Sequence, residues 1–500
     1  MKTKLTGRFV IGYAGGDHAI YPSGEVVYEG DSIVFVGHGY PGAVDATHDF
    51  GDAIISPGFI DLDALADIDH AILDTWLTPD RVAGQRWSEE YFRSGPRDAF
   101  SFEDEVFKRR YALVQLVLNG ITTAMPIAAE TYRAWAETYE EFAATAAIAG
   151  ELGLRMYLGP SYRGGVNVTR MDGTPDVLWD EPRGEAGLDA AIRFVRDFDG
   201  RFDGLVRGAL LPARVETNTL AVLRRTKAFS DECGCPVRLH AAQGAQEARF
   251  LRQWYDKRPL ELLHELGFLG PRTLIPHATT LGEGGEGADG VGDLALLRDR
   301  GTSVVHCPLI SLRHGGVLRS FDRYRRLGIN LALGTDTFPP DMIRVMDYGS
   351  NVGKFAKGDQ SSSTAADFFR AATLGGARAL GRDDLGRLAP GAKADITVVD
   401  LGSLHSGPID DPIRTMLYNT NGANVRTVIV NGRTIMADRQ IPGVDVAALR
   451  ERAQRYFAAY KRAYTDRDYL HRPPDELFPP SFPVVTPPVV TPPSVGRSEA

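Results

Sequence analysis

Three histidines and one aspartate occupy equivalent places in the chain, each at or near the end of a short run of β-branched or apolar residues. His240 lies in "PVRLHAA", His277 in "TLIPHA", His306 in "TSVVHCP", and Asp336 ends "INLALGTD". Imidazole and carboxylate groups can bind divalent ions and transfer protons. One histidine in such a place would be unremarkable, whereas four such residues on successive runs indicate a site. For His306 two interpretations stay open: it faces the pocket, or it hydrogen-bonds locally.

These residues belong to a repeating unit that extends from about Pro57 to Asp336. Short β-branched runs alternate with longer helical stretches, a pattern that indicates parallel strands. The eight runs cover residues 54–61, 120–127, 155–160, 204–212, 236–242, 273–278, 302–308 and 329–336. An α/β chain of eight such units is predicted to form a (β/α)8 TIM barrel, whose active site lies at the carboxyl ends of the strands. The candidate residues fall at those ends.

The segments outside this unit suggest further domains. Residues 1–55 and 386–440 alternate with period two and lack a complete core, so we expect them to pair into one small β-sandwich domain beside a barrel of residues 56–385. Residues 441–470 should form a C-terminal helix that packs on its own subunit or makes a dimer contact, and we expect a homo-oligomer. Residues 471–500 form a Pro-rich tail, expected to be extended or disordered.

Composition limits the possible partners. The net charge of -9 and the absence of a broad basic face argue against a nucleic-acid or anionic-membrane partner and favour a small-molecule substrate. No signal peptide is apparent, and no apolar run reaches the roughly 18 residues that span a bilayer. Three cysteines are too few for a disulfide framework, which suits a reducing cytoplasm. We therefore expect a cytoplasmic protein.

Six motifs in order carry a family resemblance: "PGFID", "RLHAAQ", "IPHATTL", "VVHCPL", "LALGTD", and "ATLGGARALG" with "GRLAPGAKADITVVD". With them the chain resembles the amidohydrolase superfamily, especially its triazine-hydrolase and cytosine-deaminase-like branch, up to about residue 440. In that family the first motif leads into His-x-His, whose imidazoles bind a metal. Asp63 and Leu65 stand at those two positions here. Hydrolases of phenylurea and thiocarbamate herbicides, known for altered strand-one ligands, are similar in this respect.

The resemblance implies one divalent metal ion, zinc by preference, with manganese, iron or cobalt also tolerated. It makes His240 a ligand, His277 a ligand or a group that polarises the substrate, and Asp336 a ligand that also moves the water proton. Asp63 can replace one imidazole with an oxygen ligand, whereas Leu65 offers nothing. Two imidazoles and two carboxylates leave a divalent ion with no net charge, so its water would be less acidic than in a site of three imidazoles and one carboxylate.

A second departure is Gln243, which stands where the deaminases of this branch have a proton-shuttling glutamate. A glutamine cannot exchange protons near neutral pH, and Glu247 lies one helical turn further on. Gln243, His306, Trp76 and Phe338 are the expected substrate-binding residues. The aromatic residues after strand one either form a lid for an apolar substrate or pack that loop onto the barrel.

We therefore expect a metal-dependent amidohydrolase that cleaves a non-peptide C–N bond by attack of metal-bound water. Its substrate would be an amide, urea or carbamate of an apolar or aromatic small molecule, which fits xenobiotic degradation, with Asp336 and His277 as catalytic residues. One alternative is an aminohydrolase or dechlorinase of a nitrogen heterocycle, which requires that Glu247 reach the site. An alternative from another class is a metal-free binding protein without catalysis.

Overall fold

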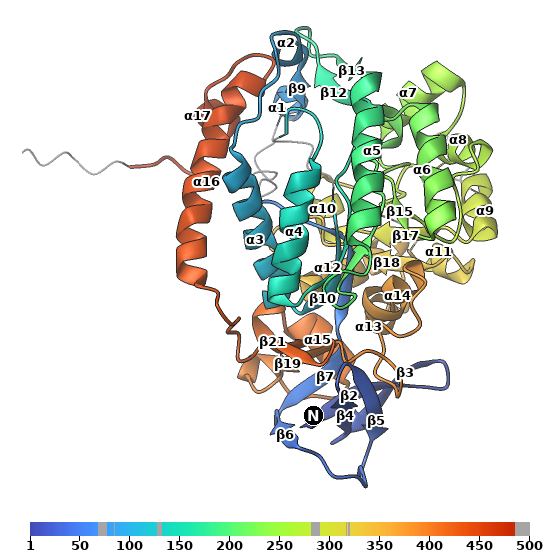
Figure 1. Ribbon diagram of the computed structural model, residues 1–500, viewed down its shortest axis with the longest axis vertical. Helices are drawn as coiled ribbons and strands as arrows, with labels where there is room; N and C mark the ends of the chain where they lie inside the picture. The colour runs from blue at the N-terminus through green and yellow to red at the C-terminus, as the bar shows by residue number, and fades with distance from the viewer. Residues whose placement is uncertain are drawn as a thin grey trace, which may run out of the picture.

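The computed structural model describes residues 1–68, 78–84, 86–127, 133–281, 291–316, 318 and 321–485 (Figure 1). Trp76, expected to bind substrate, and the last part of the Pro-rich tail lie outside these ranges. No helix in the described part of the chain combines the length and the apolar character needed to cross a bilayer.

Eight parallel strands form the predicted barrel in two hydrogen-bonded halves. The first half has the order β14-β11-β10-β8 and the second the order β15-β16-β17-β18. Leu210 bridges to Val237 between the halves on one side, and the Asp336 amide donates to the Asp63 carbonyl on the other. The strands are β8 (Phe59–Ala64), β10 (Ile121–Pro126), β11 (Arg155–Leu158), β14 (Val206–Gly208), β15 (Val237–Arg238), β16 (Thr273–Pro276), β17 (Ser303–His306) and β18 (Leu331–Leu333). The (β/α)8 prediction is thus confirmed.

The segment predicted as the first barrel strand is in fact two strands that belong to different sheets. β7 (Ala53–Pro57) belongs to a six-stranded sheet outside the barrel, whereas β8 begins after Gly58 and belongs to the barrel. A Cβ atom at Gly58 would lie 2.1 Å from the side chain of Thr122 on β10, so only glycine permits the close approach at this crossing. The chain therefore leaves one sheet and enters the next without a loop.

The N-terminal strands and the strands between residues 396 and 436 meet in a pair of sheets below the barrel in Figure 1. β19 (Ile396–Asp400) pairs antiparallel with β7 in the six-stranded sheet β21-β20-β19-β7-β2-β3, and a second sheet has the order β5-β4-β1-β6. Buried residues from both sheets, such as Leu5, Val26, Ile55 and Val398, form one core. The other strands of this region are β1 (Lys2–Thr6), β2 (Phe9–Ala14), β3 (Asp17–Pro22), β4 (Glu25–Glu29), β5 (Ser32–Gly37), β6 (Ala46–Asp49), β20 (Val425–Val430) and β21 (Arg433–Met436).

Helices follow most of the barrel strands and cover the outside of the barrel. Side-chain caps define several of their first turns; Thr138, for example, caps α4 with Glu141 as its capping-box partner. The helices from α1 to α15 are α1 (Pro79–Gly84), α2 (Glu89–Arg93), α3 (Phe102–Leu118), α4 (Tyr139–Leu152), α5 (Glu181–Phe198), α6 (Leu220–Cys233), α7 (Ala245–Tyr255), α8 (Pro259–Glu265), α9 (Val291–Arg300), α10 (Pro308–Arg313), α11 (Phe321–Arg326), α12 (Met342–Lys357), α13 (Ala365–Arg370), α14 (Gly376–Ala379) and α15 (Pro412–Asn419).

The C-terminal helix α16 (Val446–Arg467) lies along α3 on the outside of the barrel (Figure 1). Its residues Tyr456, Tyr460 and Tyr464 share a buried cluster with Phe107 of α3 and with Phe478, which follows the short helix α17 (Pro474–Leu477). The apolar face of the helix is thus covered within its own chain. A small sheet of β9 (Trp87–Ser88), β12 (Gly165–Thr169) and β13 (Pro175–Trp179) completes the described strands.

Candidate functional site

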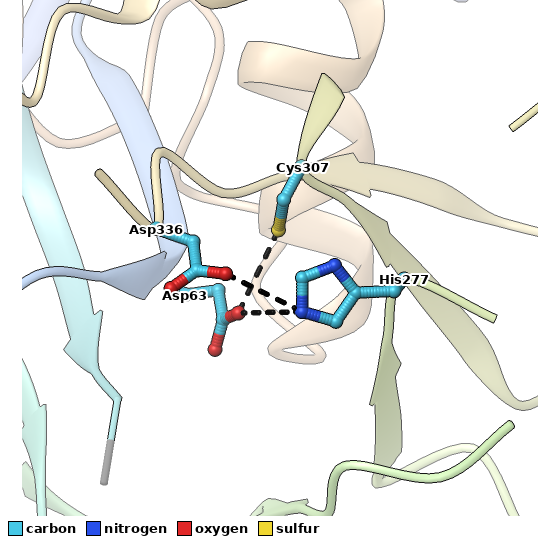
Figure 2. A group of neighbouring side chains, drawn as sticks. All are labelled: Asp63, His277, Cys307 and Asp336. Atoms are coloured by element: carbon cyan, nitrogen blue, oxygen red, sulfur yellow. Dashed lines mark hydrogen bonds and ion pairs between the residues drawn. The ribbon is translucent and has the colours of Figure 1, made fainter. Parts of the chain in front are cut away.

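Four buried side chains converge at the carboxyl ends of β8, β16, β17 and β18. They are Asp63, His277, Cys307 and Asp336, and each offers one ligand atom such that all four atoms lie within 4.8 Å of one another. Figure 2 shows the four groups pointing toward a common centre. The convergence follows from the barrel, since the carboxyl ends of its parallel strands surround one opening.

The imidazole of His277 lies at the middle of this cluster. Its Nε2 atom is 3.4 Å from Oδ2 of Asp336 and 3.8 Å from Oδ2 of Asp63, and Sγ of Cys307 is 3.6 Å from the same Asp63 oxygen. Burial lowers the pKa of His277 to about 3, so the ring is neutral at physiological pH. Its buried Nε2 atom has no hydrogen-bond partner among the described residues.

The backbone at two of these positions is held in a sparsely populated conformation. His277 has a φ of 61° and Asp336 a φ of 43°, both in the left-handed region that non-glycine residues rarely adopt. Gly334, two residues before Asp336, packs so closely that a Cβ atom there would lie 2.5 Å from Cβ of Asp63. Such local strain persists where the surrounding fold enforces it, commonly at active sites.

A fixed positive charge lies beside the cluster. Nη1 of Arg238, on β15, is 3.1 Å from Oδ1 of Asp63, and both side chains are buried. Burial opposes ionisation of Asp63, but the positive charge of Arg238, together with the interactions that His240 and His277 make with this carboxyl, outweighs it and holds the pKa of Asp63 well below its usual range. Asp63 is therefore ionised, with Oδ1 turned toward the guanidinium and Oδ2 turned toward the cluster.

His240 lies next to the four-residue cluster without belonging to it. Its Nδ1 atom is 3.2 Å from the carbonyl oxygen of Ala213, which can only accept a hydrogen bond, so Nδ1 is the donor. Its Nε2 atom lies 3.5 Å from Oδ2 of Asp63. Two acceptors that face each other in a buried site repel unless a proton or a cation lies between them.

These features fit a divalent ion. The unpartnered Nε2 of His277, the opposed acceptors of His240 and Asp63, and the second carboxylate of Asp336 are nitrogen and oxygen donors of the kind that zinc binds. Of the predicted ligands, Asp63, His277 and Asp336 lie in the cluster and His240 lies beside it. Cys307 was not predicted.

A cavity of about 530 Å³ opens beside this centre. Its described lining includes His240, Gln243, Glu247, His277 and Asp336 from the strand ends, the cations Arg86, Arg163 and Arg214, and the apolar side chains Trp87, Ile127 and Ile310. The predicted substrate-binding residue Gln243 therefore lies at the cavity, where its Oε1 accepts a hydrogen bond from Arg214. A small planar molecule would meet both apolar and polar groups here.

Glu247, from the first turn of α7, lines the same cavity. Its Oε1 accepts the N–H of Ala242 at 2.6 Å, and its Oε2 accepts the N–H of Gln243 at 3.0 Å. Burial and the nearby charge of Glu216 raise the pKa of Glu247 to about 8, so it keeps its proton at neutral pH. The condition set by the sequence for the heterocycle alternative, that Glu247 reach the site, is met.

Two of the expected substrate-binding residues, His306 and Phe338, do not belong to the described lining of this cavity. His306 packs in the core, with ring centroids 5.8 Å from Phe321 and 6.2 Å from Phe368. Phe338 stacks on Tyr111 at 5.9 Å in the cluster around α16. Apolar partners distant in the sequence draw both rings away from the cavity.

Sequence reasoning also missed two polar residues of the centre. Arg238 stands two positions before His240, so the period of a β-strand places both on one face, and this spacing could have revealed it. Cys307 follows His306 directly at the end of β17, where the chain turns into α10 and strand periodicity no longer predicts side-chain direction.

Comparisons with known proteins identify the family of the chain. The sequence model of the amidohydrolase family matches residues 54–435. A 5-methylthioadenosine/S-adenosylhomocysteine deaminase of Natronomonas pharaonis is 28% identical over 447 residues, which cover 87% of this chain and 91% of the relative.

Two solved structures share the fold. An adenosine deaminase from Xanthomonas campestris with bound zinc has a TM-score of 0.73 at 23% identity, over 92% of this chain and 98% of that one. The atrazine chlorohydrolase of Arthrobacter aurescens, complexed with zinc, has a TM-score of 0.69 at 20% identity, over 92% and 100% of the two chains.

Proposed function

The chain belongs to the amidohydrolase family, and from this premise we propose that it is a deaminase of a nitrogen heterocycle, with an adenine-type nucleoside as the preferred substrate. Within its family it is a metal-dependent hydrolase of C–N bonds. The relatives by sequence are named as nucleoside deaminases rather than herbicide hydrolases, and they favour the heterocycle alternative over the amide, urea or carbamate substrate that the sequence suggested. The atrazine chlorohydrolase shares the fold.

The observation that carries this proposal is the position of Glu247. Deamination of a purine requires an acid that protonates the ring nitrogen and the departing amine. Gln243 cannot serve, but Glu247 lines the same cavity as His277 and Asp336 and holds a proton at neutral pH. The expectation of an amide-type substrate depended on the lack of such an acid.

The other residues have distinct roles in this proposal. Asp63, His277 and Asp336 would hold the ion, and His240 lies beside them with its Nε2 atom 3.5 Å from Oδ2 of Asp63. A divalent ion bound there supplies an activated water molecule. Asp336 would accept one proton of the attacking water and pass it to the departing amine, which leaves as ammonia. Glu247 would protonate the ring nitrogen and recover a proton from the new hydroxyl as the ring carbonyl forms. Gln243 and Arg214 would hydrogen-bond the substrate.

The proposal is tested by ammonia release from the zinc-loaded protein. Adenosine, 5'-deoxyadenosine, 5'-methylthioadenosine and S-adenosylhomocysteine should yield ammonia and the corresponding inosine derivative, whereas aryl ureas and carbamates should not react. Glu247→Gln should abolish most of this activity, and Glu265→Gln, the same change at an exposed site, should not. Release of an aryl amine from the ureas, with no ammonia from any heterocycle, would contradict the proposal.

A further inference from the structure

Cys307 is the one member of the central cluster to which the proposed reaction gives no role. It is a free, fully buried cysteine, and its Sγ atom points into the centre rather than into the apolar core (Figure 2). We propose that Cys307 is a metal ligand, whose thiolate binds the same divalent ion as Asp63, His277 and Asp336. This inference depends on one part of the proposed function, namely that the barrel binds a divalent ion.

The spacing of the four donors supports this assignment. With ordinary zinc bond lengths, a tetrahedral ion holds a nitrogen and an oxygen ligand about 3.4 Å apart and a sulfur and an oxygen ligand about 3.6 Å apart. The distance from Nε2 of His277 to Oδ2 of Asp336 is 3.4 Å, and Sγ of Cys307 lies 3.6 Å from Oδ2 of Asp63. Two donor pairs thus have the spacing of such a tetrahedron, and Nε2 of His277 lies 3.8 Å from Oδ2 of Asp63, so small movements of the side chains would complete it.

The charge of the site also accommodates a thiolate. Two carboxylates and a thiolate carry three negative charges, of which a divalent ion neutralises two. Arg238 neutralises the third, since its Nη1 lies 3.1 Å from Oδ1 of Asp63, on the side away from the ion. The whole group then has no net charge, which a buried site requires.

The donor count gives a reason for the cysteine. Without Cys307 the cluster offers one nitrogen and two oxygen donors, because strand one supplies Asp63 and the buried, apolar Leu65. The sulfur brings the number of donors to four. Zinc can expand to five ligands, so a position for the reacting water stays available.

Binding changes the covalent state of Cys307 in a defined way. In the absence of an ion, the thiol S–H faces Oδ2 of Asp63. When the ion binds, the S–H bond breaks, a sulfur–metal bond forms, and one proton leaves for the solvent. No electrons are gained or lost, and metal uptake should release one proton more in the wild-type protein than in a Cys307→Ser variant.

The test uses the full chain loaded with cobalt(II), because a thiolate ligand gives cobalt an intense near-ultraviolet charge-transfer band. The wild-type protein and the control Cys233→Ser, which alters an exposed free cysteine, should show the band at one ion per chain. Cys307→Ser should lose it and bind zinc at least about tenfold more weakly. Circular dichroism of the metal-free proteins establishes that Cys307→Ser is folded.

The outcomes separate this inference from the proposed function. Stoichiometric cobalt without the band in the wild-type protein, or a band that persists in Cys307→Ser, would overturn the role of Cys307 and leave the hydrolase proposal intact. Failure of the folded wild-type protein to bind any divalent ion would overturn both.

Discussion

The guanidinium of Arg238 lies 3.1 Å from the carboxylate of Asp63, and the two side chains form a buried ion pair at the base of the cluster. Asp63 occupies a place where the family resemblance implies a neutral imidazole. The negative charge of Asp63 on β8 is therefore matched by the positive charge of Arg238 on β15.

Arg238→Met should destabilise the metal-free protein by about 3–5 kcal/mol, because it leaves a buried carboxylate without its partner. Urea unfolding in the presence of a chelator measures this loss. The double variant Arg238→Met/Asp63→Asn should recover most of it, since no unpaired charge remains. An equal loss in the double variant would mean that Arg238 contributes packing rather than charge.

Asp63→Asn should lower the affinity for zinc at least about tenfold, because the amide is a weaker ligand than the carboxylate. The matched control is Asp61→Asn, on the same strand, whose carboxylate accepts hydrogen bonds from Thr335 instead of joining the cluster. Competition with a chromophoric chelator gives both affinities. Equal affinities in the two variants would remove Asp63 from the ligand set.

The rate of deamination should fall as the pH rises through about 8, because Glu247 acts in its protonated form. In Glu247→Gln this alkaline limb should disappear, and kcat should fall by about 100-fold or more. The measurement is the pH profile of kcat and kcat/KM for both proteins. A wild-type profile that stays flat between pH 7 and 9 would exclude Glu247 as the acid.

The same residue gives an independent prediction for stability. The folded state keeps the proton of Glu247 up to a pKa of about 8, whereas the unfolded state loses it near the ordinary glutamate value of 4.5. Between these values the unfolded state binds fewer protons, so stability falls as the pH rises. Relative to Glu247→Gln, the wild-type protein should be most stable below pH 4.5 and lose that advantage by pH 8, as followed by urea unfolding at each pH.

Arg467 connects the C-terminal helix to the cavity. Its buried guanidinium lies 3.9 Å from the ring centroid of Trp87, which lines the cavity, and 4.4 Å from that of Tyr464. Arg467→Ala should cost about 2 kcal/mol of stability and raise KM, because Trp87 loses its support. Arg467→Lys keeps the charge but not the planar contact, so its stability and KM should lie between those of the wild-type protein and those of Arg467→Ala. Thermal unfolding and steady-state kinetics measure both effects, and an unchanged KM in Arg467→Ala would show that α16 does not position this wall.

The sequence by itself determined the barrel and most of its centre. Alternating β-branched and helical runs predict parallel strands, and the carboxyl ends of such strands must surround one opening. That geometry places Asp63, His277 and Asp336 together, with His240 beside them, whatever the details of packing. Residues 54–61 are predicted as one strand although they form parts of two, because their largely apolar character does not show where one sheet ends and the next begins.

Only the tertiary structure decided the groups that lie beyond regular strands or depend on distant partners. Cys307 and Glu247 follow strand ends, where periodicity no longer predicts direction, and the turn at Ala242, with a φ of 54°, brings Glu247 back to the cavity. Position in the sequence leaves two interpretations open for His306 and suggests the pocket for Phe338, whereas the structure packs His306 against Phe321 and Phe338 against Tyr111. Side-chain direction at such places is set by the free energy of packing, which no local pattern contains.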